Sequence, residues 1–196
     1  MVGMAEGRTE SDGMRIADPR VMRALAHPAR IEIVEYLNDT GAAVSATEVA
    51  GMVGLSPSAT SYHLRELAKY GLVEQAPSRG DGRERLWRGK SQSLRIDPDL
   101  EEPGAQAAGE ALVGLYMHRE QVRAVDWLAR QGEQPAEWRE VATIMGLRLL
   151  VTADELREIN EKIRALVDQY QLRTRQADPP AGARRVTVSY ASIPDL

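Results

Sequence analysis

A segment rich in hydroxyl residues, residues 54–73, has the composition of a surface that binds another molecule. It reads GLSPSATSYHLRELAKYGLV, with four serine or threonine residues in its first half and Arg65 in its second half. Small hydroxyl side chains allow close approach and can hydrogen-bond to phosphate groups or to the edges of bases. An arginine can reach a phosphate or make a bidentate contact with guanine. A helix that only packs does not need this set of side chains, so the segment predicts contact with DNA.

Capping signals place this segment in a helix-turn-helix. Ser45 and Glu48 form a capping box at the start of one helix. After a tight turn, Ser56 caps a second helix, which we expect over residues 57–70. The apolar face of this helix turns inward, so four other side chains point outward and are the predicted DNA contacts: Ser58, Ser61, Tyr62 and Arg65. The simpler alternative is that Ser56 and Ser58 act only as caps and that Arg65 is a solvated charge.

A β-hairpin follows the second helix. Two short strands, near residues 72–76 and 84–88, flank a glycine-rich turn. With the helices that precede it, this order of elements is typical of a winged helix-turn-helix, in which the hairpin is the wing. Arginine is favoured along the DNA backbone and in a narrow minor groove, and three arginines lie at or near the tip of the wing: Arg79, Arg83 and Arg85. The alternative is an ordinary charged hairpin.

Charge is unevenly distributed along the sequence. The 196 residues carry a formal net charge of −4, whereas residues 56–95 hold eight basic and four acidic residues and carry +4. Screening limits the field of a charge to about 8–10 Å at physiological salt, so local charge decides whether phosphates are bound. A basic region in an acidic protein is therefore compatible with DNA binding.

The composition argues against several other classes of protein. There is no cysteine, which excludes disulfides and thiolate metal sites and fits a cytoplasmic location. No apolar run approaches the roughly 20 residues that cross a membrane. The three histidines each stand alone, and the sequence has neither a phosphate-binding glycine loop nor an H-E-x-x-H motif. We therefore expect a protein that is not an enzyme and has no metal site and no cofactor.

The whole chain is expected to be mainly α (α+β) and to consist of four parts. Residues 1–17 are predicted to be a disordered tail, and residues 18–90 the winged helix-turn-helix domain. Residues 91–104, which are rich in proline, glycine and acidic residues, are predicted to be a linker. Residues 105–196 would then form a small α+β region for dimerisation and effector binding.

Four elements are expected in this C-terminal region. A long helix covers about residues 105–131, and a second helix over residues 153–171 begins at a capping box. The β-branched and apolar residues of VATIMGLRLL, residues 141–150, favour a buried strand, and RRVTVSYASI near the C-terminus favours another. Aromatic and methionine side chains in this region offer surface for an effector, although packing in the core or the dimer interface is the favoured explanation for each of them: Tyr116, Met117, Trp127, Trp138 and Met145.

The long helix carries an apolar stripe at alternating steps of four and three residues, which is typical of a helix that packs against a partner helix. We expect the partner to be the same helix of a second copy of the chain. The alternative partner is the 153–171 helix of the same chain. The predicted dimer contacts lie along this stripe: Leu115, His118, Val122 and Val125.

Positions 20–88 resemble the ArsR family of winged helix-turn-helix transcriptional regulators. The matching residues are LAHPARIEIVEYL, EVAGMVGLSPSATSYHLRELAKYGLV and GRERLWRG. The resemblance implies a homodimer that reads a (pseudo)palindromic, double-stranded DNA operator. It places the recognition helix 57–70 in the major groove and the wing 78–85 on the backbone or in the minor groove. It also implies an effector, and the C-terminal half resembles the extended regulators of this type.

The sequence departs from the metal-sensing members of that family. Those proteins carry cysteines in the helix before the turn, where this chain reads TEVAGMVG. A thiolate metal sensor is therefore excluded, and the effector would be a small molecule of unknown identity. His63 stands where the family has a histidine, and it is expected to pack or to form a hydrogen bond that supports the helix. The alternative function is a dimeric ligand- or protein-binding module that does not bind DNA specifically.

Overall fold

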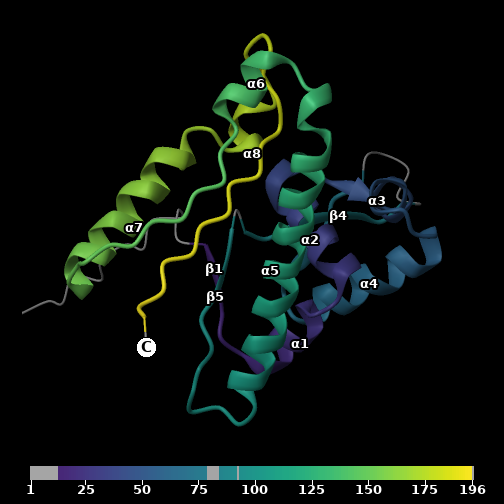
Figure 1. The fold of residues 1–196 in the computed structure, drawn as a ribbon. Coiled ribbons are helices and arrows are strands. Elements are labelled where there is room, and N and C mark those ends of the chain that lie inside the picture. The colour runs from purple at the N-terminus through teal and green to yellow at the C-terminus, as the bar shows by residue number, and fades with distance from the viewer. Residues whose placement is uncertain (1–12, 79–83, 92, 196) are drawn as a thin grey trace, which may run out of the picture. The chain divides into compact units, whose positions relative to one another are not determined.

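The computed structural model describes residues 13–78, 84–91 and 93–195. The chain divides into two compact units, Met1–Leu115 and Tyr116–Leu196, and each is described here by itself. The long helix α5 (Ala105–Arg130) contributes residues to both units. None of the described helices is long and apolar enough to cross a membrane. The protein is mainly α-helical, as the sequence predicts (Figure 1).

The helices of the N-terminal unit begin at the residues that cap them. Asp18 accepts a hydrogen bond from the backbone N–H of Arg20 over 2.7 Å, and Ser45 and Glu48 form both hydrogen bonds of the predicted capping box. Ser56 accepts from the backbone N–H of Ala59 over 3.2 Å. The four helices before the wing are α1 (Pro19–Leu25), α2 (Pro28–Thr40), α3 (Ala46–Val53) and α4 (Pro57–Lys69). Three of them start with proline, which has no N–H to leave unsatisfied there.

A small antiparallel sheet follows α4 and contains the wing. Its strands are β2 (Val44–Ser45), β3 (Val73–Ala76) and β4 (Leu86–Gly89), with β4 in the middle. Gly89 lets β4 approach α2 closely, because a Cβ at this position would lie 2.8 Å from the backbone nitrogen and 2.9 Å from the Cα of Asn38. The sheet is therefore fixed to the helical core at the base of the wing.

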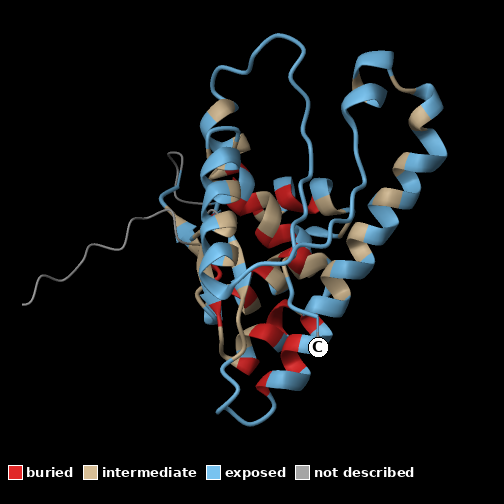
Figure 2. Ribbon diagram, turned by 60° about the vertical axis from the view of Figure 1, so that its left-hand side comes forward, coloured by how far each residue is buried: buried red, intermediate tan, exposed pale blue. Residues whose placement is uncertain are grey.

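The core of this unit consists of apolar side chains from α1 to α4, the sheet and the first turns of α5. Leu64 and Leu67 of α4 are fully buried, as is Leu112 of α5. Gly109 allows α5 to pack against the preceding loop, since a Cβ there would lie 2.6 Å from Cγ of Pro98. Figure 2 shows the buried residues of this core. Burial at these positions fixes which face of α4 remains exposed.

Two segments predicted to be irregular form a parallel pair of strands instead. Strand β1 (Met14–Ile16) lies within the predicted tail and β5 (Leu94–Ile96) within the predicted linker. Ile16 is buried, and its carbonyl accepts from the backbone N–H of Asp97 over 3.0 Å. The predicted tail and linker are wrong at these residues, because each strand has only three residues and is stabilised by the other. Residues 1–12 lie outside the described residues.

The C-terminal unit contains the rest of α5 and several shorter helices. They are the 3-10 helix η1 (Gln131–Glu133), α6 (Ala136–Val141), α7 (Ala153–Asp168) and α8 (Leu172–Arg175). The predicted capping box of α7 is present, because Thr152 and Glu155 exchange both of its hydrogen bonds.

The two strands predicted in this unit are not formed. Residues 142–151 and 183–195 belong to no helix or strand, and the backbone hydrogen bonds at their first residues, from Ala142 to Trp138 and from Ala183 to Pro180, are local turns and not pairings with a strand. β-Branched residues favour an extended backbone, but a strand also needs a neighbouring strand to bond with. The described residues of the single chain supply no such neighbour.

Candidate nucleic-acid interface

Helix α4 has one buried face and one exposed face. Thr60, Leu64 and Leu67 are buried, as the spacing of apolar residues predicts. Of the four side chains predicted to contact DNA, Ser58 and Arg65 are exposed, Tyr62 is 50% exposed and Ser61 is half-buried. The fold therefore brings the four predicted side chains together on one accessible side of one rigid helix.

The first turn of this face is organised by its hydroxyl groups. The Oγ atoms of Ser56 and Ser58 lie 3.1 Å apart and share a hydrogen bond. Because Ser56 also caps the helix, Ser58 is held at the helix N-terminus, where the macrodipole favours a negative group such as a phosphate. Ser58 does not itself cap the helix but bonds to Ser56, which does, and this bond leaves part of the Ser58 hydroxyl's bonding capacity unused.

The charges further along α4 leave Arg65 available. Glu66 forms an ion pair with Lys69, and hydrogen bonding from Lys69 lowers the pKa of the Glu66 carboxyl. No ion pair involves Arg65 among the described residues. Arg65 can therefore turn toward a phosphate or a base without breaking an existing ion pair.

His63 has the supporting role that the sequence analysis expects. Its Nδ1 accepts a hydrogen bond from Nε of Arg30 over 3.3 Å, and its ring centre lies 4.7 Å from that of His27. Burial, followed by the nearby His27 and Arg30, lowers the pKa of the His63 imidazole. Sequence reasoning did not identify Arg30 or His27 as part of this site. Their only signal in the sequence was the segment LAHPAR, which belongs to the stretch that resembles the ArsR family.

The wing is described only in part. Arg79 and Arg83 lie outside the described residues, whereas Arg85 is described and exposed just before β4. Arg88, farther along β4, forms an ion pair with Glu74 of β3 over 2.7 Å. Of the three predicted wing contacts, Arg85 is therefore the one that the structure describes, and its side chain is accessible.

The residues predicted to form the dimer are accessible along α5. Leu115 is half-buried and His118 is exposed, while Val122 and Val125 are 45% and 58% exposed. On α7, the helix that could have covered them within the chain, Leu166 is also exposed. In the single chain, the alternative in which α7 buries the stripe is not realised.

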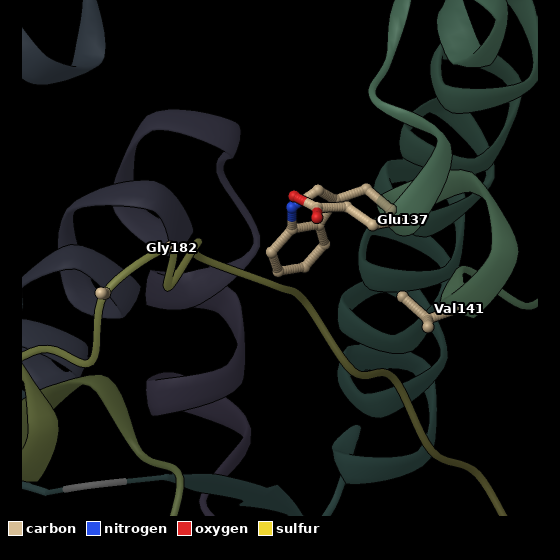
Figure 3. Close-up of a pocket in the computed structure, with 5 residues that line it drawn as sticks. Glu137, Val141 and Gly182 are labelled. Atoms are coloured by element: carbon tan, nitrogen blue, oxygen red, sulfur yellow. The ribbon is translucent and has the colours of Figure 1, made fainter.

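A shallow pocket lies beside α6 in the C-terminal unit. It has a volume of about 270 Å³ and is lined by Glu137, Trp138, Val141, Ala181 and Gly182. Figure 3 shows Glu137 and Val141 on α6, with Gly182 on the loop across from them. Of the side chains considered for an effector, only Trp138 lines it. Within the described part of the chain, no cluster of three or more His, Asp or Glu residues could hold a metal ion.

Comparisons with known proteins agree with this geometry. A family model described as a helix-turn-helix domain matches residues 25–76. The search of curated proteins found no match.

Several solved structures are similar to parts of the chain. A homodimeric winged helix-turn-helix DNA-binding domain from Mycobacterium bovis, described as a possible ArsR-family regulator, is 23% identical over 54% of this chain and 76% of its own, with a TM-score of 0.32. A predicted DNA-binding transcriptional regulator from E. coli is 28% identical over 49% of this chain and 85% of its own, with a TM-score of 0.31. The zinc-responsive MarR family member ZitR of Lactococcus lactis is 14% identical over 74% of this chain and 76% of its own, with a TM-score of 0.33.

The assignment rests on the family model and on the order of the elements. The matched residues include α2, α3, α4 and β3. Strand β4 follows them in the sequence and pairs with β3, so it completes the hairpin. Residues 25–76 are therefore a helix-turn-helix domain, and together with β4 they form a winged helix-turn-helix.

Proposed function

We propose that the protein is a sequence-specific transcriptional regulator that binds a (pseudo)palindromic DNA operator as a homodimer. Helix α4 lies in the major groove, and the wing, residues 78–85, lies on the backbone or in the minor groove. The main observation in support of the proposal is that α4 is amphipathic. Its apolar face is buried in the domain, while Ser58, Tyr62 and Arg65 remain accessible on the other side.

The chemistry of this exposed face suits DNA. In a helix-turn-helix, the N-terminal part of the second helix contacts the base edges. Small hydroxyl groups at Ser58 and Ser61 permit the close approach that this contact needs, and Arg65 lies two turns from the start of the helix. The region from 56 to 95 is also the basic part of an otherwise acidic chain. Its charge favours association with phosphates through counterion release.

The C-terminal unit supports the homodimer. None of its described residues is buried, although many of them are large and apolar. A unit of this composition needs a further surface against which its apolar side chains can be removed from water. A second copy of the stripe that contains Val122 and Val125 provides a self-complementary surface about a two-fold axis. A two-fold dimer then presents two copies of α4 to two half-sites of the operator.

Selection from a random pool of DNA duplexes by the purified protein tests the proposal. We expect an enriched site with two related halves separated by about one helical turn or a multiple of it. Against that site, Arg65→Ala should lower the affinity by about 1–3 kcal/mol per half-site if the arginine pairs with guanine. Lys162→Ala, a change in an exposed ion pair on α7, is the matched loss of one positive charge away from the interface. No enrichment, together with a dimer in light scattering, would favour the binding module without DNA specificity.

The proposal also covers catalysis, cellular location and the effector. A regulator of this kind needs no catalytic group, and it would act in the cytoplasm on the DNA there. An effector, if one operates, would be a small molecule bound in the C-terminal region.

A further inference from the structure

A cluster of polar side chains lies where the start of α2 meets α4. Arg30 donates from Nε to Nδ1 of His63 over 3.3 Å, and from Nη1 to the backbone carbonyl of Ala24 over 3.0 Å. Its guanidinium carbon lies 6.0 Å from the centre of the Tyr62 ring. The rings of Tyr62 and His63 are themselves 5.6 Å apart, edge to face. One arginine thus connects the end of α1 to two neighbouring aromatic side chains of the recognition helix.

The hydrogen bond from Arg30 fixes how His63 is protonated. His63 accepts at Nδ1, so its neutral ring carries the proton on Nε2. His27 likewise accepts at Nδ1, from the backbone N–H of Ala29 over 3.2 Å. Protonation of Nδ1 in His63 would remove the acceptor of Arg30 and would add a second positive charge beside it. The contact with Arg30 therefore requires a neutral His63 imidazole.

The other ionisable groups around His63 do not change this requirement. Glu66, one turn along α4, attracts Arg30 but is already bound by Lys69. The two histidines are also poorly arranged for a metal ion, because the lone pair that would ligate it is used as an acceptor in each ring.

We propose that Arg30 is a positioning residue for the recognition helix. It holds His63 neutral, with Nδ1 turned toward α2, and it keeps the exposed Tyr62 ring beside its guanidinium. The planar fork of an arginine can donate to two acceptors while its face stays near an aromatic ring, which an ammonium group cannot do. The exposed side of α4 is therefore ordered before DNA arrives, and less conformational entropy is lost on binding. The effect on DNA rests on the proposed function, whereas the effect on His63 does not.

Nuclear magnetic resonance of the full chain labelled at histidine tests the contact itself. The chain has only three histidines, so the signals can be assigned by single substitutions. In the wild type we expect the neutral His63 ring to lack a proton on Nδ1. Arg30→Met removes both the cation and the donor, so we expect the pKa of His63 to rise. Arg23→Met removes an exposed arginine of α1 and should leave the pKa of His63 unchanged.

Arg30→Lys separates charge from geometry and also provides a variant in case Arg30→Met does not fold. The ammonium keeps the positive charge, so we expect the pKa of His63 to stay near its wild-type value. It cannot hold the carbonyl of Ala24, the imidazole and the Tyr62 ring together. We therefore expect Arg30→Lys, like Arg30→Met, to bind the selected operator about fivefold or more weakly, the size of one lost hydrogen bond.

Each result of these experiments decides part of the proposal. A proton on Nδ1 of His63, or a pKa that is the same in Arg30→Met as in the wild type, would overturn the contact. A raised pKa combined with wild-type operator affinity in both variants would overturn the positioning role. If the wild type binds no DNA, the proposed function fails and the DNA role of Arg30 fails with it. In that case the titration still decides whether Arg30 holds His63.

Discussion

The buried hydroxyl of Thr60 makes a sharp test of how α4 is held in the domain. Thr60 is 0% exposed, and its Oγ1 has no hydrogen-bond partner among the described residues. In the unfolded chain, water bonds to this hydroxyl, so folding leaves it unsatisfied at a cost of about 1–3 kcal/mol. Valine has nearly the same shape and replaces the hydroxyl with a methyl group. We therefore expect Thr60→Val to raise the free energy of unfolding by about 1–2 kcal/mol, after allowance for local adjustment.

Urea denaturation and calorimetry would measure this difference, with Thr60→Ser as the matched control. The control keeps the hydroxyl and removes one buried methyl group, so it should lower the free energy of unfolding by about 1 kcal/mol. For a chain of this length, each kcal/mol corresponds to about 2–4 °C in Tm. Operator affinity should stay at its wild-type value in both variants, because Thr60 faces the core. A valine variant less stable than the wild type would show that the hydroxyl has a partner, and the reasoning would fail.

Three further predictions concern other parts of the molecule. Val122→Glu places a carboxylate in the proposed dimer stripe and should yield a folded monomer with little specific DNA affinity; light scattering that still shows a dimer would place the interface elsewhere. Gly89→Ala should lower the free energy of unfolding by several kcal/mol because its Cβ would overlap the backbone of Asn38, and a wild-type urea midpoint would refute this. The pKa of His63 is lowered in the folded state, so the unfolded chain binds more protons below about pH 6.5. The free energy of unfolding should therefore fall as the pH drops below that value, and less steeply in His63→Gln.

The elements around the predicted site could be read from the sequence because their signals are local. The capping box at Ser45 and the cap at Ser56 each act within three residues, and both are present in the structure. The spacing that turns Leu64 and Leu67 inward is also a property of a single helix. These signals were enough to predict α3 and α4 and to identify which side of α4 is exposed.

The features that the sequence did not reveal depend on residues far apart in the chain. The hydrogen bond from Arg30 to His63 joins positions 33 residues apart, and neither residue predicts the other. The pairing of β1 with β5 depends on an even more distant contact. The prediction of a strand over 141–150 is wrong for a related reason. The segment has a composition suited to a strand, but the described residues of the single chain include no neighbouring strand that pairs with it.

The parallel pair of β1 and β5 also affects the order in which the protein can form during synthesis. Met14 pairs with Leu94, so β1 emerges from the ribosome 80 residues before its partner. At roughly 5–20 residues per second, that interval lasts about 4–16 seconds. During this time Ile16 has no strand to bond with, while the helix-turn-helix between the two segments is synthesised and is complete before β5 emerges. The helix-turn-helix can therefore fold first, and the N-terminal segment joins it last although it was made first.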